Sequence, residues 1–188
     1  YDFIEPLRSK PGVTNNFSMV TCGGQSSAPL IYGISKAVET VTKVEISSSI
    51  SSKSAGPATR LNIDEYIDTT ENLASLISGT EHTKAILVLN PAEPPVMMRT
   101  TVHLKGYGID IKKAIEMCRD MELRVQEYVP GYEIVVQPHL TQNDTISATA
   151  KVTGSEYFLP AYAGNLDIIN AAGIETARKI KMQLDSET

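Results

Sequence analysis

Residues 132–152 have the sequence YEIVVQPHLTQNDTISATAKV, and this stretch decides the fold class. Two segments, Tyr132–Leu140 and Thr145–Val152, flank the polar Gln142-Asn143-Asp144 and alternate well enough to form a hairpin. Val96–Leu104 predicts another strand upstream. Strands therefore arrive as a consecutive group late in the chain and do not alternate strictly with helices. This order favours an α+β fold, with helices packed on a largely antiparallel sheet.

Four helices and two more strands are expected outside this group. Apolar residues recur at three- and four-residue steps in each helical segment, which is the spacing of one helix face. The helical segments are residues 29–41, 62–79, 109–128 and the residues from about Asn165 onward. Lys43–Ser52 predicts a half-buried strand, because its β-branched residues partly alternate. Lys84–Leu89 is a continuous apolar run, which predicts a strand buried on both faces at the sheet centre.

The composition excludes several classes of protein. The 188 residues are 41% hydrophobic, which suits one globular domain with a sizeable core. The net charge is −5 and the 17 Lys and Arg are scattered, so no basic surface for nucleic acid or an anionic membrane is expected. No apolar run reaches the roughly 18 residues of a spanning helix, and the first residues lack a signal-peptide pattern. We expect a soluble, cytoplasmic protein.

Cys22 is the candidate nucleophile. It follows Thr21, precedes Gly23 and Gly24, and lies just ahead of the first predicted helix. A helix N-terminus favours a thiolate, and the glycines leave room and backbone N–H groups for a substrate carbonyl. The alternative is a buried structural cysteine beside a tight turn. Cys118 lies on an apolar helix face and is expected to be core packing.

A segment of small side chains is the candidate ligand loop. Its residues are Ser54, Ala55, Gly56, Pro57, Ala58, Thr59, Arg60, Leu61 and Asn62. Such a segment lets a flat or phosphorylated ligand approach the backbone, but it is also compatible with an ordinary strand-to-helix connection. Asn62 can cap the next helix, and Asn165 can cap the last helix or point its amide at a ligand. The three histidines lie far apart, and no metal site is assigned.

Five segments, in this order, resemble the bacterial acylating acetaldehyde dehydrogenases. They are VTCGGQ (residues 20–25), SISSKSAGPATRLNIDE (49–65), NPAEPP (90–95), YVPGY (128–132) and LPAYAGNLDI (159–168). The resemblance runs from about Asn16 to the C-terminus. It implies that residues 1–18 are a connector from an N-terminal Rossmann domain that this chain lacks. Residues 19–188 would then be the catalytic and dimerisation domain, similar to the C-terminal domain of glyceraldehyde-phosphate dehydrogenases.

The resemblance also implies a reaction and its partners. Cys22 would attack acetaldehyde, hydride would pass to NAD, and the resulting thioester would be transferred to coenzyme A. The Ser54–Asn62 segment would form part of the NAD site, with Asn165 on the nicotinamide side. The domain would form a homodimer. In the family, the enzyme pairs with a 4-hydroxy-2-oxovalerate aldolase during the breakdown of aromatic compounds.

Three departures from the family pattern accompany this resemblance. Thr100 stands where the family has the aspartate of Met-Arg-Asp-Thr, and a threonine cannot act as a base. Ala58 replaces a usual glycine, and the segment between Tyr132 and Ser155 is shorter. The missing dinucleotide motif and Thr100 leave open a non-catalytic dimerisation module with the same fold. A further alternative is an acylating dehydrogenase for a different aldehyde, because the sequence does not show the pocket size.

Overall fold

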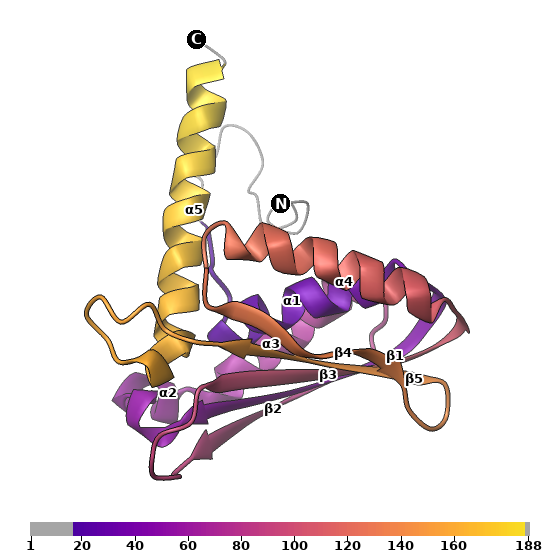
Figure 1. The fold of residues 1–188 in the computed structure, drawn as a ribbon, viewed down its shortest axis with the longest axis horizontal. Coiled ribbons are helices and arrows are strands. Elements are labelled where there is room, and N and C mark those ends of the chain that lie inside the picture. The colour runs from indigo at the N-terminus through magenta and orange to yellow at the C-terminus, as the bar shows by residue number, and fades with distance from the viewer. Residues whose placement is uncertain (1–16, 187–188) are drawn as a thin grey trace.

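The protein is a single five-stranded sheet with helices on one face, as a computed structural model describes it for residues 17–186 (Figure 1). The strands are β1 (Val38–Ser51), β2 (Thr83–Asn90), β3 (Met98–Ile109), β4 (Tyr132–Leu140) and β5 (Thr145–Val152). The helices are α1 (Cys22–Ser35), α2 (Pro57–Leu61), α3 (Ile63–Ser78), α4 (Ile111–Gln126) and α5 (Gly164–Ser186), with 3₁₀ turns η2 (Ser52–Ser54) and η3 (Ala161–Ala163). The predicted connector, residues 1–18, lies almost entirely outside the described residues.

The predicted α+β class and largely antiparallel sheet are confirmed. The strand order is β2-β1-β3-β5-β4, and every neighbouring pair is antiparallel except β1 with β2. β4 and β5 form the expected hairpin, in which Asn143 and Asp144 have φ values of 60° and 55°. Asparagine and aspartate accept this left-handed conformation more readily than most residues, which explains their place at the turn.

The position predicted for the Lys84–Leu89 strand is wrong. β2 is an edge strand, parallel to β1 and reached through α3. Ala85 is 4% exposed, whereas Ile86 is 55% and Val88 44% exposed on the face that the helices leave bare. An apolar run predicts that both faces of the strand are buried. It does not show whether residues of the same chain or of another chain bury each face.

The first helix begins and ends earlier than residues 29–41. α1 covers Cys22–Ser35, and Val38 and Val41 belong to β1. Its first two turns are rich in glycine and serine and therefore show no apolar period, which hides the true start. The spacing of Val38 and Val41 is compatible with a helix or a strand. Their pairing with β3 places them in the sheet.

The core lies between the sheet and the helices α1, α3 and α4. Leu30, Ile31 and Ile34 of α1 are fully buried against it. The prediction for Cys118 is confirmed: it is 0% exposed, and a Cβ placed on Gly33 would lie 2.8 Å from its Sγ. α1 and α4 therefore approach closely, as a glycine at the contact permits.

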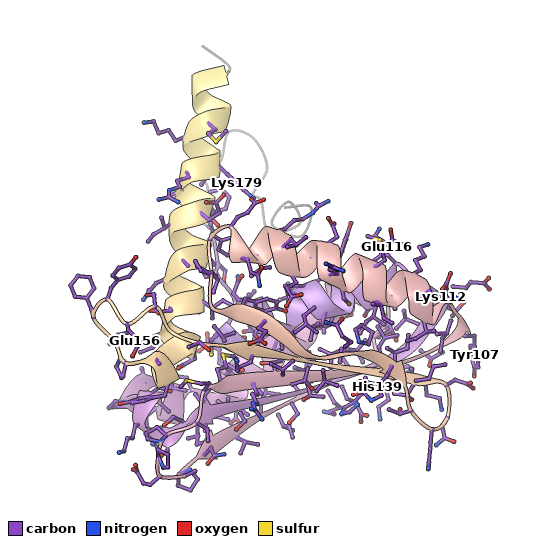
Figure 2. All side chains as sticks on the ribbon, in the orientation of Figure 1. Tyr107, Lys112, Glu116, His139, Glu156 and Lys179 are labelled. Atoms are coloured by element: carbon purple, nitrogen blue, oxygen red, sulfur yellow. The ribbon has the colours of Figure 1, made fainter. Side chains whose placement is uncertain are left out.

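The outer surfaces differ on the two sides of the molecule. Lys112 and Glu116 lie on the outer side of α4 (Figure 2), and both are exposed. The opposite face of the sheet has no helix over it in residues 17–186 (Figure 1). None of the helices in this part of the chain combines the length and apolar character that a membrane crossing requires.

Candidate functional site

Cys22 is the first residue of α1 rather than the residue before it. Thr21 is the N-cap, and its Oγ1 accepts a hydrogen bond from the Gly24 N–H at 2.8 Å. The same oxygen lies 2.7 Å from Oγ1 of Thr70 in α3. The start of α1 is thus fixed both by its own cap and by the neighbouring helix, which holds the thiol in one place.

The space beside the two glycines after Cys22 is filled by side chains of the protein itself. A Cβ on Gly23 would lie 1.8 Å from the Tyr66 hydroxyl oxygen and 2.8 Å from Ser48 Oγ. A Cβ on Gly24 would lie 3.1 Å from a methyl carbon of Leu73. The expectation that these glycines leave room for a substrate carbonyl is therefore wrong for their side-chain positions, because α3 and β1 occupy that volume.

A polar cluster lies beside the thiol, and we refer to Cys22, Ser48, Tyr66 and Thr100 as the Cys22 cluster. Ser48 and Thr100 are register partners on β1 and β3, 1% and 0% exposed, and their hydroxyl oxygens are 3.1 Å apart. Thr100, the departure from the family pattern, is therefore part of the site. The Tyr66 hydroxyl is buried and has no hydrogen-bond partner of good geometry.

The environment of Cys22 favours the neutral thiol. Burial raises the pKa of Cys22 to about 11, although hydrogen bonds with the Gly23 backbone and the Tyr66 side chain act in the opposite direction. Burial also raises the pKa of Tyr66, and the nearby thiolate raises it further. The helix N-terminus alone does not activate this thiol in the described structure.

The Ser54–Asn62 segment is folded onto itself. It comprises the end of η2 and the short helix α2. Arg60 donates from Nε to the Ala55 carbonyl at 3.1 Å and from Nη2 to the Ser52 carbonyl at 2.9 Å. Its guanidinium therefore stabilises the segment. Gly56, Pro57, Ala58 and Leu61 are exposed, and Thr59 is half-buried.

The capping role predicted for Asn62 is wrong. Asn62 occupies the N-cap position of α3, but its side chain makes no capping hydrogen bond. Its Nδ2 instead donates to the Ala58 carbonyl at 2.9 Å, which closes α2 from the other side. The side chain is thus used by the preceding turn.

Asn165 lies inside α5 and does not cap it. Its Nδ2 donates to the Ser54 carbonyl at 3.3 Å, and the residue is 4% exposed. Its Oδ1 is buried and has no hydrogen-bond partner. The structure therefore brings together Asn165 and the Ser54–Asn62 segment, the two parts that the resemblance assigns to one cofactor site, and leaves one amide oxygen free to accept.

Sequence reasoning missed Ser48, Tyr66 and Thr70. Tyr66 belongs to the apolar stripe of α3, so its helical spacing indicated an inward ring but not what its hydroxyl meets. The serine run of β1 carried the useful signal, because a buried serine in a strand requires a polar neighbour.

Other hollows lie apart from these residues. A groove of about 650 Å³ runs beside α5, between the turn at Pro130 and Gly131 and the exposed side chains of Tyr157 and Phe158. Neither Cys22 nor a residue of the Ser54–Asn62 segment lines it. Within residues 17–186, no three His, Cys, Asp or Glu side chains are grouped so that they could hold a metal ion.

Comparison with known proteins identifies the family. The family described as "Prokaryotic acetaldehyde dehydrogenase, dimerisation" matches residues 22–160. Acetaldehyde dehydrogenase of Spirochaeta aurantia is 50% identical over 164 residues, covering 87% of this chain and 55% of that protein. The enzyme of Pectobacterium atrosepticum is 49% identical over 88% of this chain and 55% of its own length. The chain thus spans about half the length of these curated relatives.

A solved structure supports the fold. The crystal structure of aspartate semialdehyde dehydrogenase II from Vibrio cholerae, complexed with ASA, superimposes with a TM-score of 0.52 at 12% identity. The match covers 81% of this chain and 54% of that one, so the shared feature is the architecture. The family match and the two relatives lead to one assignment. The chain belongs to the prokaryotic acetaldehyde dehydrogenases, and residues 22–160 are its dimerisation domain.

Proposed function

We propose that the protein takes part in the NAD-dependent oxidation of acetaldehyde to acetyl-CoA, as the catalytic and dimerisation part, with Cys22 as nucleophile. The observation that carries this proposal is the placement of Cys22 at the first position of α1, fixed by Thr21 and beside a buried polar cluster. The membership of the acetaldehyde dehydrogenase family supports the choice of aldehyde.

The proposed chemistry takes place on the Cys22 sulfur. The thiolate forms a carbon–sulfur bond with the aldehyde carbonyl, whose oxygen takes up a proton to give a thiohemiacetal. Bound NAD would supply the hydride acceptor for conversion of this adduct into a thioester, and the hydroxyl proton would leave to water. The coenzyme A thiol would lose its proton to water and attack the thioester carbonyl, and Cys22 would leave as thiolate, ready for another cycle. The backbone N–H groups of Cys22 and Gly23 support developing negative charge near the sulfur, whereas the Gly24 N–H is bonded to Thr21.

Asn165 and the Ser54–Asn62 segment are the residues that we assign to the cofactor. The free, buried Oδ1 of Asn165 suits a carboxamide N–H, which is the donor that a nicotinamide offers. Exposed backbone at Gly56 and Pro57 suits the approach of a flat ligand, and the side chain of Ala58 limits that approach by only one methyl group. The buried unpaired oxygen is the structural support for the fit.

The bare face of the sheet is the surface that we assign to the homodimer. Ile86 and Val88 of β2 are exposed on it, and Thr101 and Thr149 form a hydrogen-bonded pair of 2.9 Å at its centre. The exposed apolar pair on β2 suits packing against a second copy. A 4-hydroxy-2-oxovalerate aldolase is a further proposed partner, supported by the resemblance alone. A pull-down of the purified aldolase checks it.

Two observations favour a second candidate, a dimerisation module without chemistry. Burial raises the pKa of Cys22, which favours the neutral thiol, and position 100 carries a threonine and not a carboxylate. The two candidates differ in whether Cys22 reacts with aldehyde at all.

The deciding experiment joins this chain to the part of the Spirochaeta aurantia relative that the match does not cover. NADH formation from acetaldehyde is followed by absorbance, with and without coenzyme A, and acetyl-CoA is identified by mass spectrometry. We expect turnover that requires coenzyme A and is lost in Cys22→Ser, with Cys118→Ser as the matched control that keeps it. Oxidation that ignores coenzyme A would refute the acylating reaction, and equal inactivity of all variants would favour the module.

A further inference from the structure

Tyr66 carries a hydroxyl that packing does not explain. Its ring lies on the inner face of α3, and the residue is 9% exposed. Its hydroxyl oxygen is buried without a hydrogen-bond partner of good geometry. A phenylalanine would fill the same volume without leaving a polar atom unpaired, and an unpaired buried hydroxyl destabilises the folded state. The hydroxyl therefore points to a use in a state of the protein other than the resting one.

The hydroxyl faces the residues around the nucleophile. It lies where a Cβ of Gly23 would be, together with Ser48 Oγ. The Tyr66 side chain also acts to lower the pKa of the Cys22 thiol, which is the effect of a donor near a thiolate, although no hydrogen bond of good geometry joins the two groups in the described structure. Ser48 is in turn 3.1 Å from Thr100. Residues from α3, β1 and β3 thus lie together beside Gly23 at the start of α1, next to Cys22.

We propose that Tyr66 is a positioning residue that donates its hydroxyl hydrogen to the Cys22 thiolate. Ser48 lies next to the Tyr66 hydroxyl, and its own hydroxyl is 3.1 Å from that of Thr100. This inference rests on the proposed role of Cys22 as nucleophile.

The hydrogen bond strengthens when the thiol ionises. A neutral thiol is a weak hydrogen-bond acceptor, whereas a thiolate is a strong one. The Tyr66 hydrogen bond therefore stabilises mainly the ionised form of Cys22. The thiol proton leaves to water and not to Tyr66, whose own proton stays on oxygen because burial holds the pKa of this phenol above its usual range. Tyr66 therefore stabilises charge and removes no proton.

The arrangement also explains why position 23 is glycine. Any side chain there would occupy the place of the Tyr66 hydroxyl, at 1.8 Å from its oxygen. Gly23 is thus required for the contact between α3 and the sulfur.

The test measures thiol ionisation directly in the 188-residue chain. Cys22 and Cys118 are alkylated with iodoacetamide from about pH 7 to about pH 10.5, a range that brackets the ordinary thiol pKa, and each is quantified by mass spectrometry. In Tyr66→Phe we expect the rate at Cys22 to fall about ten-fold at each pH below the pKa, since a hydrogen bond to a charged group is worth about one pKa unit or more. The matched control, Tyr107→Phe at the far end of β3 (Figure 2), should leave the profile unchanged.

A second variant separates this effect from unfolding. Fluorination of the Tyr66 ring keeps its shape but makes the hydroxyl a stronger donor, so the Cys22 profile should move to lower pH. Buried Cys118 reports the fold in every sample, because it reacts only when the core opens. An unchanged Cys22 profile in both Tyr66 variants, with Cys118 still protected, would overturn the proposal.

The outcome is independent of the proposed reaction. Alkylation needs no cofactor or aldehyde, so a shifted profile together with no acetyl-CoA formation would overturn the function and leave the role of Tyr66 intact. Normal acetyl-CoA formation with an unshifted profile would support the function and overturn the role of Tyr66.

Discussion

Asn165 and Ser54 are 111 positions apart in the chain, and a 3.3 Å hydrogen bond joins the Asn165 Nδ2 to the Ser54 carbonyl. The bond fastens the start of α5 to the segment after β1. Because both ends are buried, it fixes the position of the Asn165 amide oxygen, which is the acceptor that we assign to the cofactor.

Replacing the Asn165 amide should cost stability. Asn165→Asp keeps the shape but puts a carboxylate oxygen against a carbonyl oxygen, so we expect the free energy of unfolding to fall by about 1–3 kcal/mol in urea titrations. Asn170→Asp, on an exposed position of the same helix, is the control and should change little. Equal stability of the two variants would show that the bond to Ser54 contributes nothing.

A methyl group at Gly23 should be poorly tolerated. Gly23→Ala forces Tyr66 or the start of α1 to move, and overpacking of this kind destabilises by about 1–3 kcal/mol. Gly56→Ala is the matched control, because a Cβ added at Gly56 would meet no atom within 4 Å. Thermal unfolding followed by circular dichroism should show a lower midpoint for the first variant alone.

The folded state should lose stability above about pH 9. Burial raises the pKa of Cys22 to about 11 and that of Cys118 to about 12, from an ordinary value of 9.0. Below about pH 9 both thiols are neutral whether or not the chain is folded. Above it, the unfolded chain ionises first, which favours unfolding by up to about 1.4 kcal/mol per thiol for each pH unit, until pH reaches the folded pKa.

Urea unfolding at about pH 8, 9 and 10 under reducing conditions checks this pH dependence. Cys118→Ala should show a smaller loss between about pH 9 and pH 10 than the parent chain, whatever its stability at about pH 8. An identical loss in both proteins would mean that the Cys118 thiol does not contribute.

The bare sheet face should carry the dimer contact. We expect the chain to sediment at twice its mass of 20.4 kDa. Ile86→Lys places a charge on β2 in that face and should shift the protein towards monomer at micromolar concentration. Leu123→Lys, on the exposed side of α4, should leave the dimer intact. Dissociation by the second substitution alone would place the contact on the helices.

The elements that local signals define could be predicted from the sequence. The β4–β5 hairpin follows from alternation around the turn at Asn143 and Asp144, and α4 from its apolar spacing. The edge position of β2 could not be predicted, because strand order depends on which strands pair across the whole chain. The early start of α1 was hidden for another reason, since its glycines and serines carry no hydrophobic period.

The site was predictable only in part. The neighbours of Cys22 were compatible with a nucleophile and with a structural cysteine, and the resemblance favoured the nucleophile. The resemblance also paired Asn165 with the Ser54–Asn62 segment. The approach of Tyr66 to Gly23 could not be predicted, because helical spacing shows which face is buried but not how near two helices come. Thr100 appeared as a missing carboxylate, whereas the structure shows it as the partner of Ser48.

β1 connects the two parts of the site by a fixed length of extended chain. Ser48 lies beside the nucleophile, and three residues later Ser51 leads into the segment assigned to the cofactor. Inserting one residue between them would turn every following side chain to the other face of the strand. The exposed hairpin tip at residues 141–144 carries no such constraint. Reporter domains or affinity tags for engineering this protein therefore belong at that tip.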